Sequence, residues 1–244
     1  MGSLIRVGSY AVHPAISDGT THAHKFDFGL VASFGKAWTR WSLNALRALP
    51  SGACCAYDSQ RQRFWTIGGL SSQPAFIRYL DVRSRENREV AYGKGAVFAP
   101  PADPDSMTMR YDPAHDLLIL SCTFGNKLRL AFLRCESPEK GWREAALSSP
   151  IPFVAQWTHP FDFVPGINKY VMLSPADKTA VFDFVLPADP TQSWQVTRQA
   201  LRAGGTVNSA YVVGKRWSYS SAAGCFVWVA SSTSPVVAYR PVGL

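Results

Sequence analysis

The chain has 244 residues, of which 47% are hydrophobic, 13% aromatic and only 17% charged, and its formal net charge is +8. No run of eighteen apolar residues occurs, which excludes a transmembrane helix, and the first residues lack an apolar signal core followed by a small-residue cleavage site. The five cysteines show neither metal spacing nor an even disulfide set, so we expect buried free thiols in a reducing compartment.

One spacing recurs four times along the chain. An aromatic residue is followed by a short turn and then, seven positions later, by a bulky apolar residue. The pairs are Tyr57 and Phe64, Tyr111 and Leu118, Phe163 and Tyr170, and Tyr219 and Phe226. A period slightly above 50 residues predicts one supersecondary unit that is copied and stacked. We expect the aromatic first members to occupy equivalent buried sites.

Residues 1–48 form the first copy, although no opening strand is recognisable there. Phe26-Asp27-Phe28 reappears later as Phe182-Asp183-Phe184, and in three copies a tryptophan stands ten positions after such an aromatic residue. We expect these tryptophans on the fourth strands, with their indole N–H groups paired: Trp38, Trp142 and Trp194. The segment 4–12 is predicted as one strand that pairs around Val236 to Tyr239 or with a neighbouring subunit.

Residues 49–99 give the clearest copy. Strands are predicted at Ala53 to Tyr57, Arg63 to Ile67 and Phe76 to Leu80, with a fourth near Glu89 to Tyr92. The remaining copies span 100–149, 150–203 and 204–244. Their third strands are predicted at Leu128 to Leu133, Thr179 to Leu186 and Pro235 to Tyr239.

The first turn of each copy uses residues suited to tight turns. Asp58 and Asp112 open two of these turns, and Asp can bond to nearby backbone. The turns are predicted to close at Gln62, Asp116, Asn168 and Gly224, and Asn, Asp or Gly tolerate positive φ there. Four-stranded antiparallel units repeated every 50 residues predict an all-β fold, a β-propeller of about five blades in a single domain over 1–244.

The copies resemble kelch or galactose-oxidase-like propeller repeats. The resemblance is carried by "FWTIGG" at 64–69, by "FIRYLD" at 76–81 and by the late tryptophans. The segment from Lys215 to Pro241 looks like the last blade of bacterial kelch-like proteins. The resemblance spans roughly residues 22–241, and it implies a propeller scaffold.

Several residue sets are candidates for catalysis or metal binding. Asp58 and Asp112 share one repeat position, as Asp27 and Asp183 share another, so we interpret them as structural and not as the paired carboxylates of a glycosidase. Tyrosines in the blades lack accompanying histidines for copper. His22-Ala-His24, with His13 and Asp18 nearby, is the one local metal-like signal, because i and i+2 share a face in a strand. We expect no cofactor and no bound metal.

A basic cluster is the candidate interaction loop: Arg78, Arg83, Arg85 and Arg88. Acidic neighbours dilute this cluster, so nucleic-acid binding is not favoured. Low charge together with many arginines and aromatics is typical of protein interfaces.

We therefore expect a non-catalytic propeller that contacts other protein subunits, of a cytoplasmic or virion-associated structural type. The alternatives are a carbohydrate-binding propeller, which the dissimilar loops after the second strands argue against, and a glycosidase-type enzyme.

Overall fold

The computed structural model describes the backbone of four N-terminal strands, namely 5–7, 10–13, 22–27 and 38–42. Beyond these it describes residues 54–68, 76–84, 86–90, 107–123, 127–153, 159–174, 176–177, 179–201, 217–229, 236–241 and 243. The strands of this part of the chain form five antiparallel sheets, each within one sequence repeat, and the fold is an all-β β-propeller. None of its helices is long and apolar enough to cross a membrane.

The first sheet has four strands in the order β1-β2-β3-β4. They are β1 (Ile5–Val7), β2 (Tyr10–His13), β3 (His22–Asp27) and β4 (Trp38–Ser42). The prediction that segment 4–12 is one strand is therefore wrong, and its pairing near Val236 or with a neighbouring subunit stays a prediction. Val7 pairs with Tyr10 across two residues, Gly8 and Ser9, and a two-residue connection with glycine first is a strong hairpin signal.

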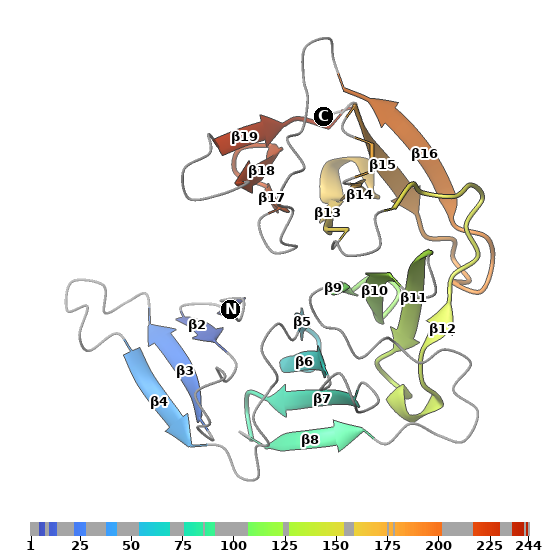
Figure 1. Cartoon of the computed structure of the whole chain (residues 1–244). Helices are drawn as coiled ribbons and strands as arrows, with labels where there is room; N and C mark the ends of the chain where they lie inside the picture. The colour runs from blue at the N-terminus through green and yellow to red at the C-terminus, as the bar shows by residue number, and fades with distance from the viewer. Residues whose placement is uncertain are drawn as a thin grey trace. The chain divides into compact units, whose positions relative to one another are not determined.

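The second sheet has the order β5-β6-β7-β8, and Figure 1 shows its ribbons side by side. Its strands are β5 (Cys54–Asp58), β6 (Arg63–Gly68), β7 (Phe76–Asp81) and β8 (Asn87–Val90). The first three begin and end within one residue of their predicted bounds. Aromatic and β-branched residues fill the inner strand β6, where Phe64, Trp65 and Ile67 are fully buried.

The third sheet has the order β12-β11-β10-β9. Its strands are β9 (Met107–Asp112), β10 (Leu117–Thr123), β11 (Leu128–Arg134) and the short β12 (Arg143–Glu144), with the 3-10 turn η3 (Pro138–Lys140) before β12. Every residue of β10 is buried, as expected for the continuous apolar run Leu117 to Leu120 in an inner strand.

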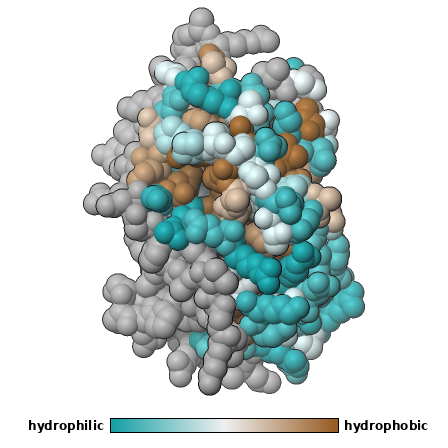
Figure 2. All heavy atoms as spheres, turned by 90° about the vertical axis from the view of Figure 1, so that its right-hand side faces the viewer, coloured by the Kyte–Doolittle hydropathy of each residue, from teal (hydrophilic) through white to brown (hydrophobic). Residues whose placement is uncertain are grey.

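The fourth sheet has the order β13-β14-β15-β16, and the fifth has the order β17-β18-β19. Their elements are β13 (Phe161–Val164), η4 (Pro165–Ile167), β14 (Lys169–Leu173), β15 (Ala180–Val185), β16 (Gln195–Ala200), β17 (Trp217–Ser220), β18 (Cys225–Val229) and β19 (Val236–Tyr239). Among the described residues the fifth sheet has no fourth strand. The outer strand β16 is polar, and the face in Figure 2 is hydrophilic over much of its described surface, with apolar patches between.

The chain divides into two compact units. The first comprises 1–104, 109–118 and 134–141, and the second comprises 105–108, 119–133 and 142–244. In the second unit one apolar cluster joins the fourth and fifth sheets, with Trp217 stacked on Phe226 at 4.4 Å between ring centroids. Burial of such rings dominates the stability of a blade pair. The single-domain assignment made from the sequence stays a prediction.

The turns between the first two strands share one backbone conformation in four sheets. Gln62, Asp116, Asn168 and Gly224 have φ values of 55°, 54°, 50° and 61°. The prediction that these positions close their turns is confirmed. Asn, Asp and Gly adopt the left-handed region at low cost, whereas Gln62 carries strain there. In the second and third sheets the carbonyl of this residue accepts the N–H that follows the third strand, from Val82 and Cys135.

Candidate functional site

The two repeated aspartates organise their turns in the same way. Asp58 Oδ1 accepts the backbone N–H groups of Gln60 and Arg61, both at 3.0 Å. Asp112 Oδ1 accepts those of Ala114 and His115, at 2.8 and 3.2 Å. Both carboxylates are buried, and each one satisfies backbone donors that the tight turn leaves unpaired. Their repeated position thus has a structural explanation.

Arg61 links the turns of the second and third sheets within the first unit. Its guanidinium donates to both oxygens of Asp116, at 2.6 and 2.5 Å, and also to Asp58 Oδ2 at 3.1 Å. Gln60 Nε2 reaches the Pro113 carbonyl of the other turn at 2.9 Å. A planar guanidinium that binds one carboxylate with two parallel bonds and a second carboxylate with a third bond fixes both turns in register.

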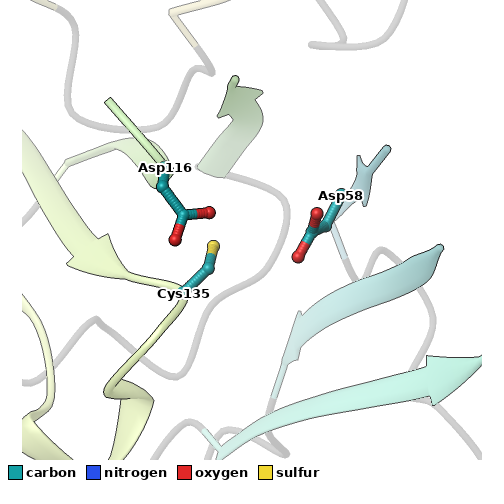
Figure 3. Close-up of side chains that lie close together, drawn as sticks. All are labelled: Asp58, Asp116 and Cys135. Carbon is teal, nitrogen blue, oxygen red and sulfur yellow. The ribbon is translucent and has the colours of Figure 1, made fainter. Parts of the chain in front are cut away.

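Asp58, Asp116 and Cys135 lie close together in this cluster, with one ligand atom of each within 4.8 Å of the others. Figure 3 shows Asp116 and Cys135 together, facing Asp58 from another strand. Burial, followed by the two neighbouring carboxylates, raises the pKa of the Cys135 thiol far above its ordinary value. A raised pKa favours the protonated thiol, which is a poor nucleophile.

Tyr111 completes the cluster. Its hydroxyl donates to Asp116 Oδ1 at 3.1 Å, and burial, with help from the nearby carboxylates, raises the pKa of this phenol well above its ordinary range. The hydrogen bond to Asp116, the largest stabilising influence, raises the pKa of the Arg61 guanidinium. The two carboxylates thus share one permanent cation, so a metal ion would have to displace Arg61 from both. We interpret the cluster as a structural clasp between two turns.

The repeated aromatic residues occupy corresponding places in their sheets. Each is the second-to-last residue of a first strand, and three of them pair directly with their partner in the second strand, with ring centroids about 5 Å apart. They are half-buried, however, and their second-strand partners are the buried members: Phe64, Leu118, Tyr170 and Phe226. The fully buried sites expected for Tyr57, Tyr111, Phe163 and Tyr219 thus belong to the partners.

The late tryptophans stand at the start of fourth strands. Trp142 and Trp194 immediately precede β12 and β16, and both are fully buried. The Trp194 indole N–H donates to the Pro190 carbonyl at 2.9 Å, as expected. The indole N–H of Trp142 meets no acceptor within the described ranges, which differs from the expectation. Trp38 opens β4, and its side chain lies outside the described residues.

The candidate basic loop does not form one exposed surface. Arg78 is only 3% exposed and is paired with Glu89 at 2.7 Å. One member of the candidate interaction loop therefore lies in the core and not on the surface. Its place on β7 explains this, because third strands are inner strands. Arg83 and Arg88 are exposed, and they contact Gln62 and Glu86. Arg85 lies outside the described residues.

Sequence reasoning missed Arg61 and Cys135. The only local signal for Arg61 was its position three residues after Asp58 in the turn, which suits an ion pair. Its stronger partner, Asp116, belongs to the next repeat, and the two residues meet only because the two turns lie side by side in the folded chain. His22 and His24 are paired with Ser42 and Arg40 in the sheet, and their side chains lie outside the described residues.

A scan against protein-family models gives no match, and a search of curated proteins finds no relative. Solved structures show the same fold. A protein from Lactobacillus plantarum matches with a TM-score of 0.58 at 10% identity, covering 95% of this chain and 62% of its own length. A putative 6-phosphogluconolactonase from Bacteroides uniformis matches with a TM-score of 0.55 at 10% identity, over 95% of this chain and 64% of that one.

A third match comes from a nidogen/laminin complex, with a TM-score of 0.54 at 10% identity, covering 98% of this chain and 76% of the other. The chain thus spans less than two thirds of the length of the first two structures. Identities this low establish the β-propeller fold alone, and the named proteins differ in function.

Proposed function

We propose that this chain is a non-catalytic, kelch-like propeller that serves as a protein-interaction or structural assembly subunit, of the virion-structural type inferred from the sequence. The observation that carries the proposal is the exposure of strand β19. Val236 is 65% exposed and Val237 is 37% exposed, and they are the exposed large hydrophobic residues of the described surface. Apolar residues gathered on a strand edge favour contact with another protein.

The other blades show why this exposure is unusual. In the second, third and fourth sheets the third strand is an inner strand, and its residues form the core, as Ile77, Phe132 and Phe182 do. β19 is the corresponding third strand of the fifth sheet, yet three of its four residues are exposed. Within the described residues it is an edge, and a strand at a sheet edge can accept an added strand from a partner.

The engagement of the acidic residues supports a non-catalytic role. Asp58, Asp112 and Asp81 each accept two backbone N–H groups in a turn, and Asp116 is bound by Arg61 and Tyr111. Acid–base catalysis needs a carboxyl group that is free to exchange a proton with a substrate. These four carboxylates instead hold the scaffold together.

The native mass of the purified chain tests the proposal. We expect a particle heavier than one chain, and Val236→Lys should convert it to a monomer, because a buried lysine at the added-strand interface is strongly disfavoured. Ala222→Lys, which places the same charge in the exposed turn of the same blade, is the matched control and should leave the particle intact. A wild-type chain that is monomeric at all accessible concentrations would contradict the proposal.

A further inference from the structure

Asp183 on β15 lies on the face of the fourth sheet that packs against the fifth sheet. It pairs with Val171 and stands two residues after Val181, and both directly paired positions and positions i and i+2 share a face. Val171 and Val181 belong to the apolar cluster that includes Trp217 of the fifth sheet. Asp183 is only 6% exposed, so this face buries a carboxylate beside apolar side chains.

The carboxylate of Asp183 is incompletely paired. Gln199 Nε2 donates to its Oδ2 at 3.1 Å, and Lys169 Nζ lies 3.7 Å from the same oxygen. Within the described residues, the other oxygen, Oδ1, accepts no hydrogen bond. Burial, which outweighs the contacts with Gln199 and Lys169, raises the pKa of Asp183. A buried carboxylate in this state is stabilised by a further donor, and a cationic donor stabilises it most.

Tyr239 on β19 shows from which side such a donor can come. This residue packs against the same apolar cluster, and burial, followed by the charge of Asp183, raises the pKa of its phenol to about 12. Among the described residues the fifth sheet has no strand on the outer side of β19. A residue directly opposite Tyr239 on an added strand would face the fourth sheet as Tyr239 does, with the two Cβ atoms about 5 Å apart.

The contact between the third and fourth sheets shows what a fourth strand contributes at such a place. Phe132 on β11 packs against Trp194, which immediately precedes β16, with ring centroids 6.0 Å apart. There the third strand of one sheet presents an aromatic side chain, and the fourth strand of the next sheet covers it with another. The third strand of the fourth sheet presents Asp183 instead, so the complementary side chain on an added fourth strand is a positive one.

We propose that the partner of β19 is an extended basic segment that adds a strand to the fifth sheet and places a lysine or arginine opposite Tyr239, facing Asp183. The inference rests on the proposed function, because it uses the β19 edge as the interaction surface. Val237 stands two residues before Tyr239 and shares its face, so the partner residue opposite Val237 should be apolar. The partner strand thus presents one cationic and one apolar side chain to the fourth sheet.

Two synthetic peptides test this partner chemistry. One is Thr-Val-Thr-Lys-Thr-Val-Thr, and the other has methionine in place of the lysine; in a strand, each places its central residue and both valines on one face. Fluorescence anisotropy of the labelled peptides measures their binding to the full chain at a concentration at which the chain is monomeric. We expect the lysine peptide to bind at least roughly ten-fold more tightly, as a hydrogen bond between charged groups would give.

Two variants separate the partner chemistry from the interaction edge itself. Asp183→Asn should abolish the preference for lysine, whereas Asp189→Asn, which removes an exposed carboxylate between β15 and β16, should preserve it. Circular dichroism shows whether each variant is folded. Equal binding of the two peptides, binding of neither, or a preference that survives Asp183→Asn would overturn the inference. The proposed function is tested separately, by the native mass and by Val236→Lys, which should weaken both peptides if β19 is the edge.

Discussion

Arg61→Leu should be the most destabilising change among the exposed and half-exposed arginines of the first unit. The side chains of Arg61 and Asp116 are each 25% exposed, whereas the Asp58 side chain is fully buried. Losing Arg61 leaves Asp58 with its two backbone donors and Asp116 with Tyr111, but neither with a countercharge. The Asp58 carboxylate would then be a buried charge without a cation.

The expected loss of stability lies between the values for a fully buried ion pair and for an exposed one. Removing one partner of a fully buried pair costs about 3–5 kcal/mol, and an exposed pair contributes about 0–1 kcal/mol. The quarter exposure of two members and the remaining donors place the expected loss at about 2–3 kcal/mol. Arg61→Lys keeps the charge but loses the two-pronged contact with Asp116, so it should cost about half as much.

Urea unfolding monitored by tryptophan fluorescence measures these losses as a shift in midpoint at constant slope. Arg134→Ala is the matched control, because this exposed arginine takes part in no ion pair within the described residues. A double-variant cycle with Asp116→Asn, which tolerates the left-handed backbone, should show that the two changes are less than additive. The clasp interpretation fails if Arg61→Leu costs no more than Arg134→Ala.

Three further outcomes are expected. Gln62→Gly should raise stability by about 0.5–1 kcal/mol by relieving its positive φ; an unchanged or lower melting temperature would contradict this. Phe226→Ala should cost about 3–5 kcal/mol and Tyr219→Ala clearly less, since only Phe226 is fully buried; equal losses in denaturant titrations would refute that ranking. Burial raises the pKa of Asp183 despite Gln199 and Lys169, so its charge opposes folding at neutral pH; Asp183→Asn should stabilise there, with a gain that shrinks as pH falls and Asp183 becomes protonated.

The sequence predicted the elements that every copy shares. Strand bounds, and turns closed at Asp116 and Asn168, follow from local chemistry, because apolar alternation and positive φ depend on residues close in the chain. The hairpin at Gly8 was missed because the first copy was aligned by its second half alone. Arg61 was missed since its main partner belongs to another repeat, and pairing between repeats depends on spatial stacking that one sequence does not specify.

Residues that depart from the repeat are the candidates for function in this protein, because residues at repeated positions have a structural explanation. Asp58 and Asp112 look like a catalytic pair in composition, yet they make the same two backbone bonds in successive turns, so the repeat itself explains them. Val236 breaks the rule that a third strand is buried, and no local turn or strand requirement calls for an exposed valine there. Burying such a side chain on binding is favourable by about 1.5–3 kcal/mol. The exposed edge of β19 is therefore the surface that we propose for the interaction.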